Sequence, residues 1–219
     1  MTGSQFLDGL EPGDVRAVLA AASTRRLPSD AIIYEQEWPA NEVFLLTKGR
    51  ARYFSISPDG RKMLLHWLQP GDVLGVATLL QAPSHYRVSA ETVQDCALLT
   101  WNRRTMQAIL DQHPRLVRNA LSVSVRYLDF YIAAHAALVS STARERLASV
   151  LAHLTEAIGR EVAGGVELQV TNEELACAAN ITLFTASRIL SEWQTERALT
   201  KGRGRIVLHS PKRLFRLTA

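Results

Sequence analysis

Residues 171–194 read TNEELACAANITLFTASRILSEWQ and begin with a strong signal for a helix start. Thr171 and Glu174 have the spacing of a capping box. In this motif the Thr hydroxyl and the Glu carboxylate each satisfy a free backbone N–H group of the first helical turn. The capping box therefore predicts a short helix that covers residues 173–179.

A second helix is predicted after a tight turn. Asn180 tolerates the left-handed backbone conformation that such a turn requires. Thr182 can cap the next helix, which we expect over residues 183–194. Apolar side chains of both helices can meet across the turn: Leu175, Ala176, Ala179, Ile181, Ala186, Ile189 and Leu190. Two helices joined in this way form a helix-turn-helix, whose second helix enters the major groove of DNA and reads bases.

A basic hairpin is predicted directly after this pair of helices. Short runs at residues 198–200 and 205–208 flank the sequence Lys201-Gly202-Arg203-Gly204. From Arg197 onward the chain has no Asp or Glu and carries seven basic residues: Arg197, Lys201, Arg203, Arg205, Lys212, Arg213 and Arg216. A basic end on a mildly acidic body indicates a polyanionic partner. A solubilising tail is the alternative, and the apolar residues interleaved with the basic ones argue against it.

These elements supply the candidate DNA contacts. Candidate base-reading residues are Thr182, Leu183, Phe184, Thr185, Ser187 and Arg188. Candidate phosphate contacts are Thr171, Lys201, Arg203 and Arg205. We expect Arg188 to donate to O6 and N7 of a guanine. Leu183 and Phe184 either contact thymine methyl groups or pack against the hairpin.

The N-terminal half has a different pattern. Residues 6–24 predict a short helix with Pro12-Gly13-Asp14 as a turn in its middle. Between residues 27 and 101, short apolar runs alternate with turn signals, and Asp59-Gly60 is a good hairpin signal. The runs are residues 31–34, 43–46, 51–54, 63–67 and 97–100. Many short strands at this spacing indicate an antiparallel sandwich or barrel.

From Arg103 the pattern becomes helical again. Apolar residues step by three and four positions, the spacing of a coiled-coil seam: Leu116, Ala120, Val123, Tyr127, Phe130, Ala134 and Ala137. The seam favours a parallel homodimer, and these residues are its predicted interface. A helix packed on its own domain gives a similar stripe and is the alternative.

The long helix is interrupted before the DNA-binding part. Ser140-Ser141-Thr142 breaks the pattern, and Thr142 and Glu145 form another predicted capping box. The helix that follows ends near Ile158, and residues 166–170 alternate like an edge strand. We therefore divide the chain into a sensory domain, a dimerisation helix with hinge, and a DNA-binding domain, over residues 1–110, 111–140 and 141–219.

Several function classes are disfavoured. The chain is 47% hydrophobic and 21% charged, has no secretion signal, and has no apolar run near the roughly 20 residues that span a membrane. We therefore expect a cytoplasmic protein. Cys96 and Cys177 are too few and too far apart for a disulfide framework or a metal cluster. An enzyme is disfavoured because the sequence has no glycine-rich phosphate loop, no His-Glu metal spacing and no nucleophile elbow. Asp72 and Glu91 resemble a pair of catalytic carboxylates, but turn residues at strand ends explain them better.

The order of these elements resembles the Crp/Fnr superfamily of bacterial transcription regulators, the family of the cyclic AMP receptor protein. The matching stretches are residues 42–49, 57–61, 68–75 and 170–190. The resemblance implies an α+β fold with an antiparallel β-roll of the cyclic-nucleotide-binding, jelly-roll type, a long dimerisation helix and a winged helix-turn-helix. It further implies a homodimer that binds near-palindromic double-stranded DNA when the roll senses an effector. RNA polymerase is a further candidate partner.

The chain departs from the family in its effector motif. Cyclic-nucleotide binders carry a Gly-Glu pair and then Arg-Ser, which hold the ribose and the cyclic phosphate. Here the first pair is Gly75-Val76, and the second falls at Tyr86-Arg87, or at Arg87-Val88 with one more inserted residue, so the ribose acceptor and the Ser are missing. A buried phosphate with half its partners is costly, which disfavours cyclic AMP. The candidate effector pocket consists of Gly75, Val76, Tyr86, Arg87 and Tyr127.

Other family sensors use iron–sulfur clusters or haem. A cluster needs about four Cys ligands, and this chain has two. Haem is possible but unsupported; the candidate ligands are His66, His85, His113 and His135. Close relatives of the cyclic AMP receptor protein carry Arg and Glu at the two positions that match Leu183 and Phe184. We therefore expect a DNA half-site that differs from that of the cyclic AMP receptor protein. The alternative function is a small-molecule binding module whose DNA-binding end is residual or contacts proteins.

Overall fold

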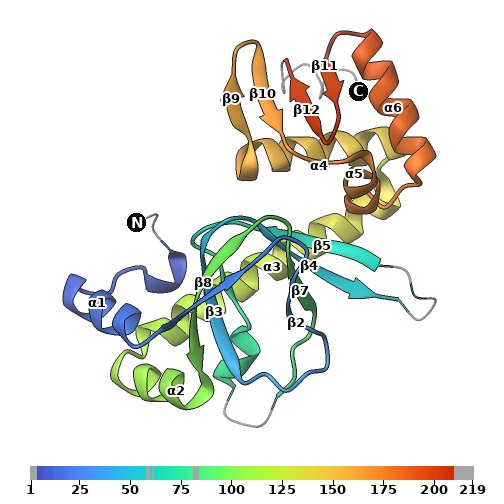
Figure 1. Cartoon of the computed structure of the whole chain (residues 1–219). Helices are drawn as coiled ribbons and strands as arrows, with labels where there is room; N and C mark the ends of the chain where they lie inside the picture. The colour runs from blue at the N-terminus through green and yellow to red at the C-terminus, as the bar shows by residue number, and fades with distance from the viewer. Residues whose placement is uncertain (1–3, 58–59, 61, 81–83, 210–219) are drawn as a thin grey trace. The chain divides into compact units, whose positions relative to one another are not determined.

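The computed structural model describes the chain apart from residues 1–3, 58–59, 61, 81–83 and 210–219. It divides into two compact units, Met1–Phe130 and Tyr131–Ala219, each with its own strands and helices (Figure 1). The α+β class predicted from the sequence is confirmed. The three-part division by residue number stays a prediction.

The first unit begins with two short helices and a strand. A 3₁₀ turn, η1 (Gln5–Leu7), precedes the helix α1 (Pro12–Ala20). The prediction of one helix over residues 6–24 was wrong at both ends. Pro12 starts α1 because the first helical position needs no N–H donor, and the chain then enters strand β1 (Ser23–Leu27), which pairs with β8 (Cys96–Asn102).

The strands of this unit form two four-stranded antiparallel sheets among the described residues, in the orders β1-β8-β3-β6 and β2-β7-β4-β5 (Figure 1). The remaining strands are β2 (Ile32–Tyr34), β3 (Glu42–Lys48), β4 (Ala51–Ile56), β5 (Lys62–Leu68), β6 (Val73–Leu74) and β7 (Ser89–Thr92). A 3₁₀ turn, η2 (Val76–Leu79), follows β6. The predicted antiparallel roll is thus confirmed.

Aromatic side chains fill part of the roll. Tyr34 stacks on Tyr86 with ring centroids 3.9 Å apart and on Phe44 at 5.7 Å. The Tyr86 hydroxyl donates to the Glu42 carbonyl at 2.9 Å and accepts from the Glu42 backbone N–H at 3.1 Å. All three aromatic residues are buried, so they hold the two sheets together from inside.

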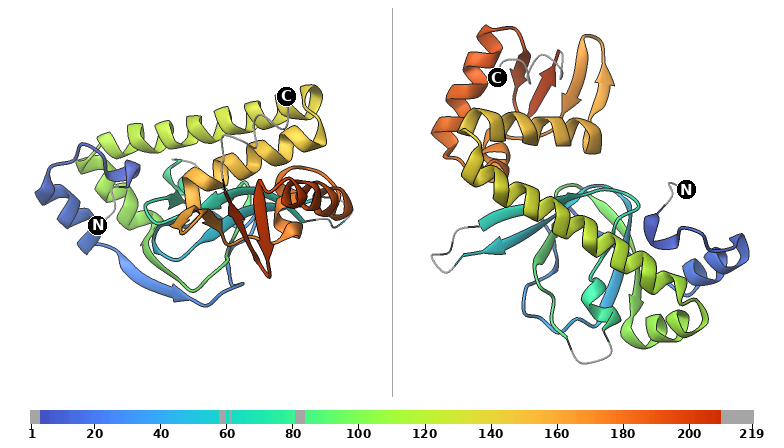
Figure 2. Two further views of the ribbon diagram at one scale, coloured as in Figure 1. Left: turned by 90° about the horizontal axis from the view of Figure 1, so that it is seen from above. Right: turned by 180° about the vertical axis from the view of Figure 1, so that it is seen from behind.

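Two helices complete the first unit. These are α2 (Arg103–Gln112) and the part of α3 (Arg115–Ser140) up to Phe130, and Figure 2 shows this part of α3 running alongside the roll. Leu116, Ala120 and Val123 of α3 are buried in the core of their own unit. The predicted dimer seam is therefore corrected for these three residues, because side chains buried within one chain have no surface left for a second one.

A second apolar stripe on α3 is exposed. Its members lie one or two residues further along than those of the buried stripe, so it faces a different side of the helix. Its members are Val117, Leu121, Val125, Leu128 and Ile132. The side chains of Ala134 and Ala137, which the predicted seam also included, lie outside the described residues.

The second unit contains the predicted helix-turn-helix. Its helices are α4 (Ala143–Ile158), α5 (Asn172–Ala178) and α6 (Leu183–Thr195). Its strands are β9 (Arg160–Val162), β10 (Gly165–Leu168), β11 (Leu199–Gly202) and β12 (Arg205–Leu208), in the order β11-β12-β10-β9. The prediction that residues 166–170 form an edge strand was wrong. These residues belong largely to β10, which lies between β9 and β12 and pairs with both.

Candidate nucleic-acid interface

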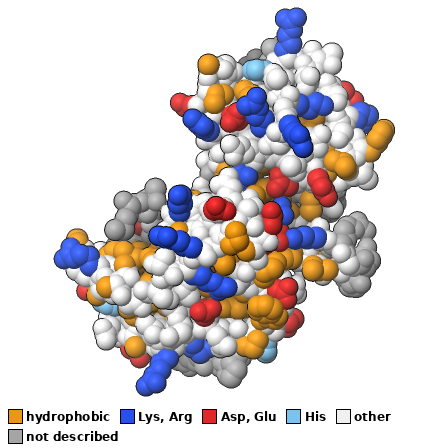
Figure 3. All heavy atoms as spheres, viewed as in Figure 1, with side chains coloured by type: hydrophobic (Ala, Val, Ile, Leu, Met, Phe, Trp, Pro, Cys, Tyr) orange, Lys and Arg blue, Asp and Glu red, His pale blue; other side chains and the backbone are white. Residues whose placement is uncertain are grey.

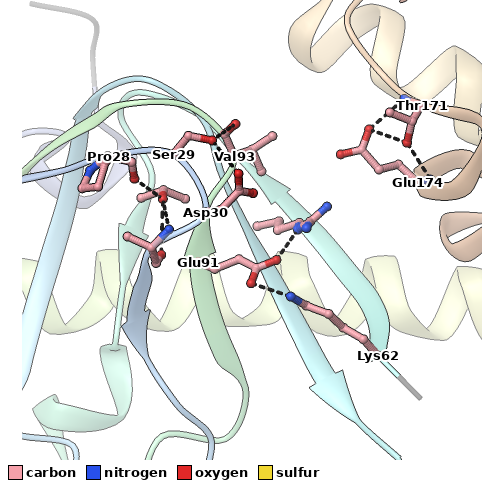
Figure 4. A network of polar contacts seen from close by, with 11 residues as sticks. Pro28, Ser29, Asp30, Lys62, Glu91, Val93, Thr171 and Glu174 are labelled. Atoms are coloured by element: carbon pink, nitrogen blue, oxygen red, sulfur yellow. Dashed lines mark hydrogen bonds and ion pairs between the residues drawn. The ribbon is translucent and has the colours of Figure 1, made fainter. Parts of the chain in front are cut away.

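The start of α5 has the capping box that the sequence predicts. The Thr171 hydroxyl accepts from the Glu174 backbone N–H at 3.1 Å, and the Glu174 carboxylate accepts from the Thr171 backbone N–H at 2.8 Å (Figure 4). This closes two of the open N–H groups of the first turn. The predicted capping box of α4, between Thr142 and Glu145, is also present.

The turn between α5 and α6 follows the sequence signals. Asn180 has a positive φ of 49°, as a left-handed turn residue does. The Ile181 backbone N–H donates to the Ala176 carbonyl at 2.9 Å, which ties the turn to α5. The Thr182 hydroxyl accepts from the Thr185 backbone N–H at 3.1 Å and caps α6. The predicted helix-turn-helix is therefore confirmed.

The two faces of α6 differ sharply. Ala186, Ile189, Leu190 and Trp193 are buried against the rest of the unit. On the outer face, Leu183 is 51% exposed and Phe184 is 79% exposed. This exposure favours an outward-facing role for the apolar pair over packing against the hairpin.

Polar residues continue the outer face. The side chain of Arg188 is 56% exposed, and its guanidinium forms an ion pair with Glu192 at 2.5 Å. Thr182 and Thr185 share a hydroxyl contact of 2.8 Å, and the Ser187 hydroxyl lies 3.3 Å from Asn172 Nδ2. The predicted base-reading residues thus lie along the first two turns of one helix.

Sequence reasoning missed two residues of this region. Glu192 binds Arg188 and also forms an ion pair of 2.7 Å with Arg144, at the start of α4. The spacing of Arg188 and Glu192 by four positions is a signal for a helical ion pair. Arg144 carries no such signal, because 48 residues separate it from Glu192.

The β11–β12 hairpin forms the predicted wing and carries basic side chains. Lys201 Nζ donates to the Ser191 hydroxyl at 2.8 Å, and Arg205 lies 3.5 Å from Glu167. Arg203 lies in the turn and is exposed. Figure 3 shows Lys and Arg side chains over the part of the second unit where Figure 1 places β11, β12 and α6. Lys212, Arg213 and Arg216 lie outside the described residues.

The candidate effector residues come together only in part. Gly75 lies against Tyr86, because a Cβ added to Gly75 would stand 3.1 Å from Tyr86 Cε1. Val76 starts η2, and Tyr127 packs edge-on to Tyr53 with ring centroids 5.8 Å apart. Arg87 has an exposed side chain. The structure thus places Gly75 and Tyr86 side by side inside the roll and leaves Arg87 at its surface.

The candidate haem ligands lie in unrelated surroundings. His66 packs against Tyr127, His113 lies 3.6 Å from Asp14, and His85 and His135 are exposed. Within the described residues, no three His, Cys, Asp or Glu side chains are grouped for a metal ion. The same residues contain no helix long and apolar enough to cross a membrane.

Two acidic residues of the first unit have structural partners. Glu91 is buried within β7, and its carboxylate binds Arg52 at 2.6 Å and Lys62 at 2.5 Å (Figure 4). The expectation that Glu91 belongs to a turn was therefore wrong. Asp72 does lie in the turn before β6, where it accepts from the Gln69 backbone N–H at 2.8 Å. Burial raises the pKa of Asp72 above its ordinary value.

Family comparisons agree with this geometry. The family model of a cyclic nucleotide-binding domain matches residues 24–113, and that of a Crp-like helix-turn-helix domain matches residues 145–217. The chain belongs to the Crp/Fnr family of transcription regulators. This Crp/Fnr regulator therefore combines an effector-binding domain with a DNA-binding domain, and its family is non-enzymatic and binds DNA as dimers.

Individual relatives match along most of their length. The cyclic AMP receptor protein of Thermus thermophilus is 28% identical over 94% of this regulator and 93% of its own chain. The nitrogen fixation regulation protein FixK of Azorhizobium caulinodans is 26% identical over 92% of this regulator and 80% of its own chain. The solved structure of FixK2 from Bradyrhizobium japonicum superposes with a TM-score of 0.77 at 27% identity, over 90% of this regulator and 98% of that chain.

Proposed function

We propose that this regulator binds a near-palindromic site in double-stranded DNA as a homodimer. The two copies of α6 enter successive turns of the major groove, about one helical turn apart. The exposed outer face of α6 carries the proposal: Leu183, Phe184 and Arg188 point outward from a helix whose other face is buried.

The outer face is suited to base reading. Arg188 presents a guanidinium that can donate two hydrogen bonds to guanine, which is worth about 1–3 kcal/mol of discrimination. Leu183 and Phe184 offer apolar surface to thymine methyl groups. The hydroxyls of Thr182, Thr185 and Ser187 add donors and acceptors at the same end of the helix.

The wing and the start of α5 are suited to phosphate contacts. Lys201, Arg203 and Arg205 place three positive charges on one short hairpin. Thr171 adds an exposed hydroxyl at the start of α5 that can donate to a phosphate oxygen. Contacts of this kind set the position of a protein on DNA without reading its sequence.

The exposed stripe of α3 is suited to dimerisation. Its members, Val117, Leu121, Val125, Leu128 and Ile132, are spaced by four, four, three and four residues. Such a stripe packs well against a second copy of itself. Because members of the family bind DNA as dimers, we assign this stripe to the partner subunit.

The roll is proposed to sense an effector other than cyclic AMP. Val76 stands where a cyclic-nucleotide binder needs a carboxylate, and a Val side chain accepts no hydrogen bond from a ribose hydroxyl. The exposed position of Arg87 also favours another effector. RNA polymerase is a candidate partner of the DNA-bound dimer, and the proposal places the protein in the cytoplasm.

Selection of DNA by the purified, ligand-free protein tests the proposal. A random library is bound at near-physiological salt, and the retained fragments are sequenced. We expect a palindrome whose half-sites lie about one helical turn apart. Diffuse binding that modest salt abolishes would reduce the DNA-binding end to an electrostatic contact and favour a small-molecule binding module.

A further inference from the structure

A chain of four charged side chains links the start of α4 to the outer face of α6. Glu192 uses one carboxylate oxygen for Arg188 at 2.5 Å and the other for Arg144 at 2.7 Å. Arg144 also donates to both carboxylate oxygens of Glu196 at 3.1 Å. Both oxygens of Glu192 are therefore occupied by guanidinium groups, which fixes the plane of its carboxylate.

Arg144 is itself held firmly. Its side chain is 26% exposed, and its guanidinium lies over the ring of buried Trp193 at 5.2 Å. Contact with an aromatic face adds to the attraction of the two carboxylates. Arg144 is thus a fixed support for Glu192.

Arg188 depends on this support. An exposed Arg side chain has many rotamers, and ordering it on DNA costs conformational entropy. The contact with Glu192 uses only one of the five N–H donors of the guanidinium. Enough donors are left for a bidentate contact with guanine, and part of the ordering takes place before DNA binds.

The same turn of α4 also holds the turn before α6. Arg146 Nε donates to the Ala179 carbonyl at 3.0 Å, and its Nη1 donates to the Ser141 carbonyl at 2.7 Å. Two arginines of the first turn of α4 therefore fix both the base-reading helix and the turn that precedes it. The first turn of α4 begins directly after the break between α3 and α4 at Ser141-Thr142.

We infer that Glu192 and Arg144 are positioning residues for base recognition, and that they act through Arg188. The inference rests on the proposed function, since it requires α6 to read DNA. A purely structural salt bridge is the alternative, and exposed pairs of that kind contribute little. If Glu192 and Arg144 position Arg188, substitutions in the network lower sequence discrimination. If the ion pairs are purely structural, discrimination stays the same.

The test compares the affinity of the protein for its selected site with its affinity for the same site in which the G·C base pair read by Arg188 is replaced. The ratio of the two affinities is the discrimination. Glu192→Gln should lower this discrimination by about tenfold. Binding to non-specific DNA should hold or rise, because a negative charge near the phosphates is lost. Glu192→Asp keeps the charge but is too short to reach both arginines, so it should also lower discrimination.

Glu196→Gln is the matched control. The substitution removes the same charge near the same end of α6. Glu196 contacts Arg144 but not Arg188. Discrimination by this variant should stay within about twofold of the wild type, since the contacts of Glu192 with Arg188 and Arg144 are both left intact. Arg144→Met should weaken discrimination, and Arg144→Lys should restore part of it. Circular dichroism melting confirms that each variant is folded.

A double-mutant cycle separates positioning from other effects. In an Arg188→Ala background, Glu192→Gln should change discrimination no further, because no guanidinium is left to position. Undiminished discrimination in folded Glu192→Gln and Glu192→Asp would overturn the inference, as would an equal loss in the Arg188→Ala background. Failure of the wild type to select any site would instead overturn the proposed function.

Discussion

The imidazole ring of His66 lies edge-on to the phenol ring of Tyr127, with ring centroids 4.9 Å apart. Tyr127 also meets Tyr53 at 5.8 Å, and Phe130 lies 5.2 Å from His66. These aromatic contacts join α3 to strands β4 and β5. The long helix is thus packed on the roll by the same sequence stripe that suggests a coiled-coil seam.

Removal of this contact should loosen α3 from the roll. Tyr127→Ala deletes an aromatic side chain that is partly buried, and we expect a loss of about 2–3 kcal/mol in the free energy of unfolding. Urea unfolding measures the loss. Asp129→Ala, an exposed change on the same helix, should cost less than about 0.5 kcal/mol. Equal losses for the two variants would contradict the packing role.

The backbone at one residue of the candidate effector pocket, Gly75, requires glycine. Its φ is 73°, and a Cβ there would stand 2.7 Å from the Glu42 carbonyl oxygen. Gly75→Ala therefore combines backbone strain with a clash and should cost about 3 kcal/mol. Gly204 has a similar φ of 66° with no described atom within 4 Å. Gly204→Ala should cost only about 1 kcal/mol in chemical unfolding, and a reversed order would refute the account.

The exposed stripe of α3 should control oligomeric state. Leu121→Glu and Leu128→Glu place charges in the proposed subunit contact, so sedimentation should detect monomers at concentrations where the wild type is dimeric. Ser122→Glu adds the same charge on an exposed face outside the stripe and should leave the dimer intact. Dimers that persist in both Leu variants would place the subunit contact elsewhere.

The wing should contribute to the salt dependence of DNA binding. Arg203→Ala should flatten the plot of log affinity against log salt concentration by about one unit, because one fewer phosphate is neutralised. Filter binding over a series of salt concentrations provides the slope. Arg160→Ala removes an exposed charge on β9 and should leave the slope unchanged. An unchanged slope for Arg203→Ala would remove Arg203 from the interface.

The capping box of α4 should make stability depend on pH. The Thr142 backbone N–H, with a further contribution from its hydroxyl, lowers the pKa of Glu145 below its ordinary value of 4.5. A lowered pKa in the folded state stabilises the protein above pH 4.5, and this contribution is lost as the pH falls through the folded value. Glu145→Ala should therefore be less stable than the wild type at neutral pH. The gap between their melting temperatures should shrink on acidification, and a constant or growing gap would count against this account.

The helix-turn-helix could be predicted from sequence because its signals are local. Thr171 and Glu174 are three residues apart, and Asn180 forms its turn from its own backbone preference. β1 could not be predicted in the same way. Its sequence STRRL has no alternation, and it is a strand because Ser23 pairs with Thr100, far along the chain.

The face of α3 was ambiguous for a related reason. Two apolar stripes lie one or two residues apart, and both have helical spacing. Only packing shows that Leu116 is buried in its own unit while Val117 is exposed. Arg144 was missed because its contact with Glu192 depends on how α4 and α6 meet, which neither segment encodes alone.

The most direct test of the dimeric, sequence-specific reader changes the spacing of the two half-sites. About five base pairs inserted between them rotate one half-site to the opposite face of the DNA. We predict that affinity falls by about 100-fold or more, toward the value for non-specific DNA. Substitution of the central base pairs at constant length should have a much smaller effect. Undiminished affinity for the lengthened site would contradict recognition by a dimer with two fixed α6 helices.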